Sequence, residues 1–181
     1  LFVMNCFYRI LLVPLTFALA FGCASSGGAT KTYDKSDNET IYRSGTIGVG
    51  QISSGGYGGN TPLTVRVVSE CSGRSCTPNV VRLTFAVDGE TSDVGLSGRR
   101  TFSVSTDESE YEYEQVTMYD GRIQKSEGRL LTVKVPISDL EQIATATSIN
   151  GTIGGLSLNL RRAQSDLQRF LFAIRNPEER P

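Results

Sequence analysis

The 181-residue chain contains no histidine and no tryptophan. The missing histidine removes the commonest general base, the commonest metal ligand and the partner that activates serine or cysteine nucleophiles. The formal net charge is only −1, so no overall positive field attracts nucleic acid. Beyond the N-terminus, no apolar run approaches the ~20 residues of a membrane-spanning helix. We therefore expect no metal site, no cofactor and no nucleic-acid partner.

The N-terminal residues show the pattern of a secretory signal peptide. Arg9 is the one charged residue before an apolar run over residues 10–21, and the chain turns small and polar from Ala24. The run is too short to cross a bilayer, and Pro14 interrupts it. A cation, a short apolar stretch and small residues are typical of export. Residues 1–22 are therefore predicted to be a signal peptide rather than a buried first strand or helix.

Two cleavage positions compete in this segment. One follows Ala20, because residues 18–20 form a small-x-small triplet. The other precedes Cys23. Residues 20–23, Ala-Phe-Gly-Cys, resemble the lipobox of bacterial lipoproteins, in which an aliphatic residue, a small residue and Gly or Ala precede a lipidated cysteine. Gly22 and Cys23 match this pattern and Phe21 departs from it; the resemblance implies a lipid anchor on Cys23.

The cysteine count favours the lipidated form. The chain has four cysteines. Cys6 leaves with the signal peptide, and Cys71 and Cys76 are close enough in the sequence to pair with each other. Cleavage after Ala20 would leave Cys23 unpaired in an oxidising compartment, where a free thiol is reactive. A lipid on Cys23 accounts for every cysteine of the chain.

Composition divides the rest of the chain into a tether, a domain and a tail. Residues 23–44 are predicted to be a lipid-anchored flexible tether, because they are rich in serine, glycine, threonine and charge and lack apolar periodicity. A single domain is expected over residues 45–176, and residues 177–181 form a tail. The domain should begin with a strand over residues 46–52 and a mobile glycine loop. This loop is no dinucleotide site, because Ser53 stands where G-x-G-x-x-G needs its third glycine.

Alternating apolar and polar residues predict half-buried strands through the middle of the chain. They cover residues 63–67, 81–87, 102–104 and 131–135. Between the first two strands, Cys71 and Cys76 are spaced to form a disulfide that closes a hairpin loop. Two cysteines without histidine or further cysteines cannot complete a zinc site. Arg74 lies at the tip of this loop and is a candidate partner contact.

Glutamates and tyrosines alternate over residues 110–114. The glutamates are predicted to face solvent while the tyrosines cover the core, because like charges along one face repel and are best left in water. The alternative is a site for a cation or a basic partner. The Asp120-Gly121 pair that follows predicts a hairpin turn between strands at 116–119 and 122–125.

The apolar period becomes helical after residue 136. A first amphipathic helix should follow Ser138, which is spaced to form a capping box with Glu141. Its buried side is predicted to hold Leu140, Ile143, Ala144 and Thr147. A strand pair then turns at Asn150-Gly151 or Gly154-Gly155, and a second helix covers residues 162–175. Phe172 lies opposite the apolar side of that helix and is a second candidate partner contact.

These elements predict an α+β fold, an antiparallel β-sheet or sandwich with two C-terminal amphipathic helices. Residues 136–175 resemble an ending found in uncharacterised secreted bacterial proteins, and this resemblance implies no activity. We expect a cell-envelope lipoprotein of non-catalytic binding or structural accessory type. Its expected partners are the membrane, through the lipid, and an envelope protein or glycan. In the lipoprotein resemblance, Ala24 after the cysteine favours the outer membrane.

The alternative is a hydrolase that cleaves an envelope glycan with paired carboxylates instead of histidine. Its candidate residues are Asp107, Glu108, Glu110, Glu112 and Glu114. No spacing in the sequence singles out one pair. The two hypotheses differ in one geometric respect, because the hydrolase needs two carboxyl groups that line the same pocket.

Overall fold

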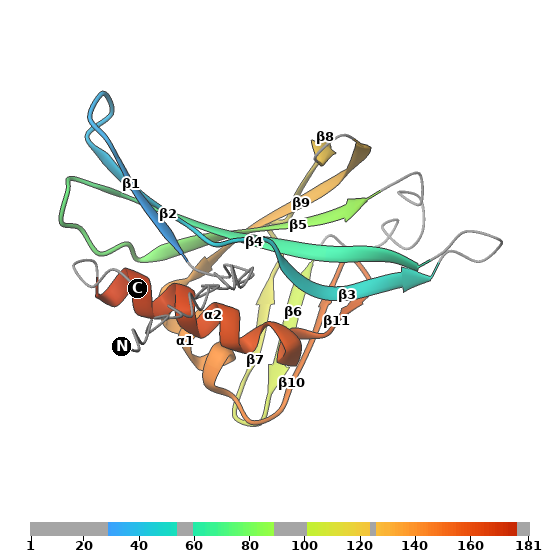
Figure 1. Ribbon diagram of the computed structural model, residues 1–181. Coiled ribbons are helices and arrows are strands. Elements are labelled where there is room, and N and C mark those ends of the chain that lie inside the picture. The colour runs from blue at the N-terminus through green and yellow to red at the C-terminus, as the bar shows by residue number, and fades with distance from the viewer. Residues whose placement is uncertain (1–28, 54–59, 89–100, 124–125, 177–181) are drawn as a thin grey trace, which may run out of the picture.

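Antiparallel strands dominate the part of the chain that the structure describes (Figure 1). The computed structural model describes residues 29–53, 60–88, 101–123 and 126–176. The strands are β1 (Thr30–Asp34), β2 (Glu39–Arg43), β3 (Ile47–Ser53), β4 (Asn60–Ser72), β5 (Val80–Asp88), β6 (Phe102–Thr106), β7 (Glu110–Tyr113), β8 (Thr117–Ile123), β9 (Ser126–Pro136), β10 (Ile149–Ile153) and β11 (Leu156–Leu158). The helices are α1 (Ile137–Thr145) and α2 (Leu160–Arg175).

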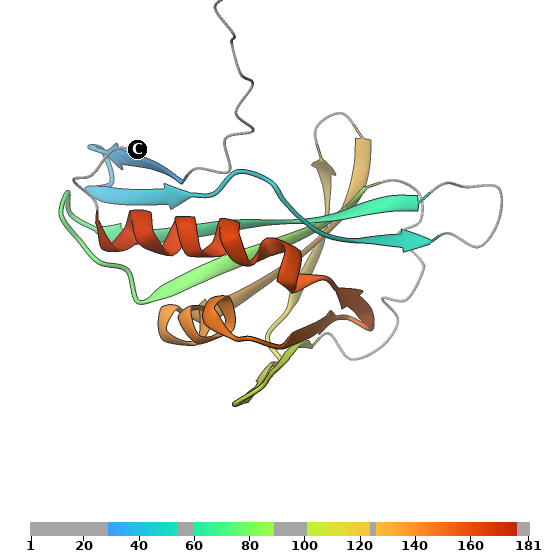
Figure 2. The ribbon, with the colours of Figure 1, turned by 60° about the horizontal axis from the view of Figure 1, so that its bottom comes forward.

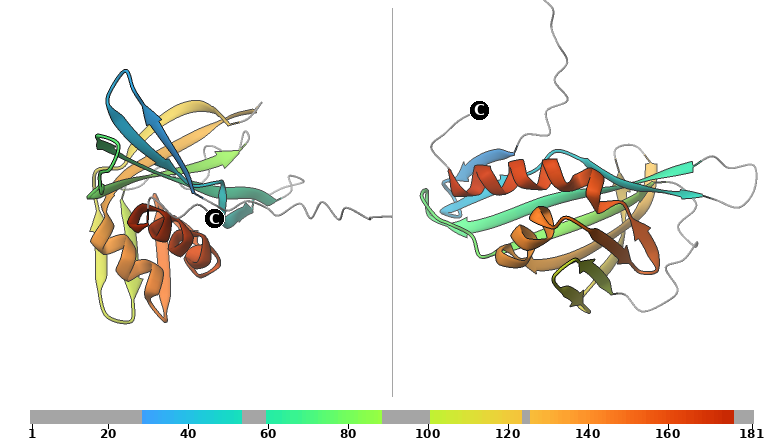
Figure 3. Two further views of the ribbon diagram at one scale, coloured as in Figure 1. Left: turned by 60° about the vertical axis from the view of Figure 1, so that its left-hand side comes forward. Right: turned by 90° about the horizontal axis from the view of Figure 1, so that it is seen from below.

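The described strands form a larger and a smaller sheet. The larger sheet has seven strands in the order β1-β2-β4-β5-β9-β8, and β3 also pairs with β4. The smaller sheet has the order β11-β10-β6-β7. Figures 1, 2 and 3 show the smaller sheet and both helices on the same side of the larger sheet. The predicted α+β class and antiparallel sheet are confirmed, with two helices of which the last lies at the C-terminus, whereas the sandwich stays a prediction.

The core lies between the larger sheet and the elements on that side. Val65, Phe85 and Leu131 form a cross-strand row on β4, β5 and β9, and each is at most 3% exposed. Phe102 of the smaller sheet packs on Phe85, with ring centroids 5.3 Å apart. The helices add buried side chains that follow the helical period: Leu140, Ile143 and Ala144 from α1, and Leu160, Ala163, Leu167, Phe170, Leu171 and Ile174 from α2. Both sheets and both helices therefore share one core.

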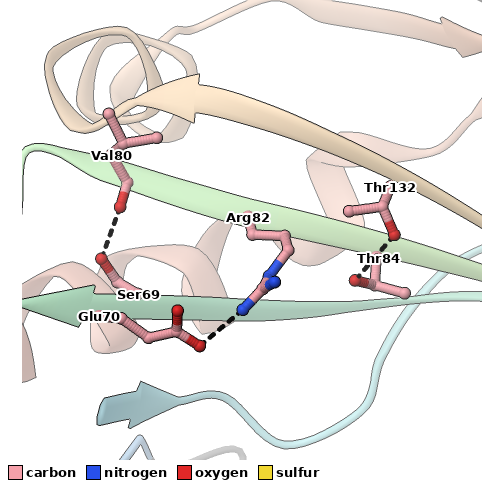
Figure 4. Close-up of polar contacts among 6 residues, drawn as sticks. All are labelled: Ser69, Glu70, Val80, Arg82, Thr84 and Thr132. Carbon is pink, nitrogen blue, oxygen red and sulfur yellow. Dashed lines mark hydrogen bonds and ion pairs between the residues drawn. The ribbon is translucent and has the colours of Figure 1, made fainter. Parts of the chain in front are cut away.

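The opposite face of the larger sheet carries polar side chains that interact between strands (Figure 4). Arg82 of β5 forms an ion pair with Glu70 of β4 at 2.6 Å, and the hydroxyls of Thr84 and Thr132 lie 3.3 Å apart across β5 and β9. The ion pair is about two-fifths exposed and adds at most about 1 kcal/mol. No described helix covers this outer face (Figure 1).

The predicted tether over residues 23–44 is wrong from Thr30 onward. Strands β1 and β2 pair with each other, and β2 pairs with β4. Thr40 and Tyr42 are fully buried. The Thr40 hydroxyl donates to the Gly73 carbonyl at 2.6 Å, so a polar sequence is ordered by contacts with a distant loop. The signal peptide over 1–22, the tail over 177–181 and the glycine loop after β3 lie outside the described residues.

The predicted disulfide between Cys71 and Cys76 is confirmed, with the two Cα atoms 5.9 Å apart. It closes the loop between β4 and β5, and this loop contacts the β1–β2 hairpin. The Gly73 backbone N–H donates to the Asn38 carbonyl at 2.7 Å. The Tyr42 hydroxyl donates to the Cys76 carbonyl at 3.4 Å. The disulfide loop therefore fixes the hairpin at the edge of the larger sheet.

The predicted turn at Asp120-Gly121 is wrong. Strand β8 runs through both residues, and Gly121 lies opposite Gly128 of β9. The ladder ends at the pair between Ile123 and Ser126. The long pairing with β9 outweighs the local preference of Asp-Gly for a turn, because each added ladder pair supplies backbone hydrogen bonds.

The start of α1 also differs from the predicted capping box. The helix begins at Ile137, after Pro136, and no side chain caps it. The Ile137 backbone N–H donates instead to the Asn79 carbonyl at 2.9 Å. The Ser138 hydroxyl donates to Asp139. Thr147 is exposed because the helix has already ended at Thr145.

Of the two predicted turns between the last strands, Gly154-Gly155 is confirmed. Both residues have positive φ angles, 56° and 86°, which glycine adopts without steric cost. Asn150 and Gly151 lie inside β10.

We expect the double variant C71S/C76S to lower the free energy of unfolding by about 2 kcal/mol, since the disulfide closes a short loop in the unfolded chain. Urea denaturation of the exported chain measures this loss. Amide hydrogen exchange should also speed up in β1 and β2, because the loop that holds them loosens. Dithiothreitol should shift the midpoint of the wild type and leave that of the variant unchanged. An unchanged wild-type midpoint on reduction would contradict the prediction.

Candidate functional site

An open groove lies where β3, β10 and β11 meet the start of α2. Its volume is about 720 Å³. The lining side chains are mostly polar, and they include the amides of Gln51, Asn150 and Asn159 and the guanidinium groups of Arg161 and Arg162. Among the described residues, none with a carboxylate side chain lines the groove. This groove is the strongest candidate binding site among the described residues.

The start of α2 forms one wall of the groove. The Asn159 backbone N–H donates to the Val49 carbonyl at 2.5 Å, which holds the end of β11 against β3. The Asn159 side chain accepts a hydrogen bond from the Arg162 backbone N–H at 3.3 Å and so caps the helix. These two bonds fix the first turn of α2, on which Arg161 and Arg162 are both exposed.

The link between α1 and β10 forms the facing wall. Two glutamines of α2 donate from their side-chain amides to carbonyls at the end of α1. Gln164 reaches the Ala146 carbonyl and Gln168 reaches the Ala144 carbonyl, both at 2.7 Å. Both walls are therefore positioned by α2, one through its cap and the other through its glutamines.

The two arginines at the groove have no carboxylate within ion-pair distance among the described residues. The guanidinium groups of Arg161 and Arg162 take part in none of the ion pairs or hydrogen bonds seen among them. The first turn of α2 holds no acidic residue. Cations in the first turn oppose the helix dipole, which favours acids at that end. The two positive charges therefore do not stabilise the start of the helix.

The five carboxylates predicted for a hydrolase are all exposed. Asp107 touches the groove wall, because its carboxylate accepts the backbone N–H groups of Thr147 at 3.1 Å and Ser148 at 3.4 Å. The other four, Glu108, Glu110, Glu112 and Glu114, line neither this groove nor the one between the two helices. The structure brings no two of the five into one described pocket, and the hydrolase stays a prediction.

The tyrosines between those glutamates cover the core as predicted. Tyr111 and Tyr113 are partly buried against it. The Tyr113 hydroxyl donates to Asp139 of α1 at 2.8 Å, and the Tyr111 hydroxyl donates to Gln142. Burial, together with the Asp139 carboxylate, raises the pKa of Tyr113 well above its ordinary value. This pair of contacts ties β7 to α1.

The remaining predicted site residues lie away from the groove. Arg74 is exposed, and its guanidinium lies 4.9 Å from the centre of the Tyr33 ring, so it already has a partner within the chain. Phe172 is 57% exposed and lines a smaller groove of about 500 Å³ between α1 and α2. Cys23 lies outside the described residues. Partner contacts at Arg74 and Phe172, and lipidation of Cys23, stay predictions.

The sequence prediction did not include Arg161 and Arg162. The available signal was an Asn followed closely by two adjacent arginines, at a helix start with no acid. The facing residues could not be assigned from the sequence, because Gln51 and Asn150 come from strands that are far apart in the chain.

Gly151 allows β10 to approach the first turn of α2. A Cβ atom at this position would lie 2.5 Å from Cδ1 and 3.2 Å from Cγ of Leu160. Leu160 is only 4% exposed, so its side chain has little room to move. The missing side chain at residue 151 therefore leaves the space that Leu160 occupies.

We expect G151A to lower the free energy of unfolding by about 1–3 kcal/mol, because the new methyl group overpacks the site against Leu160. G48A is the matched control, since a Cβ there meets no atom within 4 Å. Urea midpoints of the two variants, compared with wild type, measure the difference. Equal midpoints for G151A and G48A would show that β10 and α2 can separate without cost.

Comparisons with known proteins assign neither a family nor a function to this chain. The chain matches no protein-family model, no curated protein and no solved structure.

The described residues contain no group of three or more Cys, Asp or Glu side chains placed to hold a metal ion. Neither described helix has the length and apolar character needed to cross a membrane.

Proposed function

We propose that the chain is a lipid-anchored accessory protein of the bacterial cell envelope that binds a ligand without catalysis. The observation that carries the proposal is the Cys71–Cys76 disulfide. A structural disulfide is typical of an oxidising compartment outside the cytoplasm. It also occupies both cysteines of the domain, so that Cys23 has no partner there. A lipid on Cys23 is the use that the lipobox resemblance offers.

The start of β1 supports an anchor that keeps the domain near the membrane. The first described strand begins at Thr30, so the segment 24–29 would connect it to a lipidated Cys23. Such a segment spans roughly 20 Å when fully extended. The β1–β2 hairpin would then lie near the headgroups instead of standing off on a long tether. By the lipoprotein resemblance, Ala24 favours the outer membrane as the place of this anchor.

The open polar groove supports a binding role for the anchored domain. Its walls are fixed by hydrogen bonds within the fold, so it needs no rearrangement to receive a ligand. Preorganised sites lose less conformational entropy on binding. An envelope glycan or an envelope protein is the partner class that this location offers.

We expect the membrane-extracted protein, expressed in a bacterium that processes lipoproteins, to begin with an acylated Cys23. Mass spectrometry of the N-terminal peptide measures the added acyl mass. The variant C23S should lose that mass and leave the membrane fraction during a high-salt wash. An unmodified N-terminus at Phe21 in the wild type would overturn the anchor.

A further inference from the structure

The groove has the size of a small-molecule site. Ligand pockets typically measure about 300–1,000 Å³, and this groove measures about 720 Å³. A single carboxylate or phosphate group would fill only a small part of it. The rest of a ligand must therefore contact the neutral part of the lining.

The neutral part of the groove lining is suited to the hydroxyl-bearing ring of a sugar. Gln51 and Asn150 offer both donors and acceptors, Asn159 offers its amide N–H groups, and the hydroxyls of Ser148 and Ser157 add more. All five side chains are exposed at the groove surface. Such groups exchange hydrogen bonds with ligand hydroxyls in either direction, as a sugar ring requires.

The charged part of the lining is suited to an oxyanion. Arg161 and Arg162 are adjacent, exposed and without a carboxylate partner among the described residues. A guanidinium presents its donors in a planar fork that matches the oxygens of a carboxylate or a phosphate. An anion bound there would also relieve the unfavourable position of these cations in the first turn of α2.

We infer that the groove binds an acidic saccharide, a sugar that bears a carboxylate or a phosphate group. Arg161 and Arg162 hold the oxyanion, and the amides and hydroxyls from β3, β10 and β11 contact the sugar ring. The inference rests on the proposed binding function and names its ligand class. It does not depend on the lipid anchor.

The test is a titration of the exported full chain carrying C23S, followed by amide chemical shifts in ¹H–¹⁵N spectra. The probes are glucuronate, glucose 6-phosphate, neutral glucose and inorganic phosphate at matched ionic strength. We expect one or both acidic sugars to shift the amides of residues 148–150 and 159–162. The tighter of the two identifies carboxylate or phosphate as the recognised group, and glucose should bind at least about tenfold more weakly.

The double variant R161Q/R162Q should weaken binding of the acidic sugar by at least about tenfold. The charge-matched control is R66Q/K134Q, which removes two exposed cations from the opposite face of the larger sheet and should leave the affinity unchanged. Urea midpoints verify that both variants fold. If R161Q/R162Q did not fold, the map of shifted amides in the wild type would decide the question.

Four results would overturn the inference. They are glucose binding as tightly as the tighter acidic sugar, inorganic phosphate binding as tightly as that sugar, an equal loss in R66Q/K134Q, and shifts that lie outside the groove or do not occur at tens of millimolar. The anchor is tested separately by the mass of Cys23. Failure of either experiment therefore leaves the other result standing.

Discussion

The structure depends on covering the inner face of the larger sheet. The row of Val65, Phe85 and Leu131 crosses three adjacent strands, and a sheet with one apolar face is stable only when another layer buries that face. The smaller sheet does so through Phe102, which packs on Phe85. The two helices complete the cover. Their placement, and with it the candidate site, is a consequence of this burial.

The groove arises at the margin of that cover. Helix α2 turns Leu160, Ala163 and Leu167 into the core, and the period of 3.6 residues then directs residues 161 and 162 outward. The Asn159 cap sets the point where this period begins. The two arginines therefore reach the groove because the apolar side of the helix is already committed to the core. The same contacts that stabilise α2 thus preorganise the proposed site.

Local patterns predicted most of the strands and both helices. An element with one buried face repeats its apolar residues at its own period, and this spacing is visible in the sequence. The errors occur where a non-local contact decides the structure. Thr40 and Tyr42 belong to a polar stretch, and they can be buried because carbonyls of the disulfide loop accept hydrogen bonds from their hydroxyl groups. The turn predicted at Asp120-Gly121 gives way to a ladder with β9. The groove was not predictable for the same reason, since its walls come from segments that meet only in the fold.

Selectivity at the groove must come from short-range contacts instead of the overall field. The chain has a formal net charge of −1, and the glutamates of β7 are exposed, so an anion experiences no general attraction. Arg161 and Arg162 are exposed as well, and physiological salt screens exposed charges beyond about 8 Å. An acidic ligand is therefore distinguished from a neutral one at hydrogen-bond distance, by the orientation of the guanidinium forks. The backbone positions of both arginines depend on the hydrogen bonds of Asn159 to Val49 and Arg162, which makes the cap of α2 a positioning element of the proposed site.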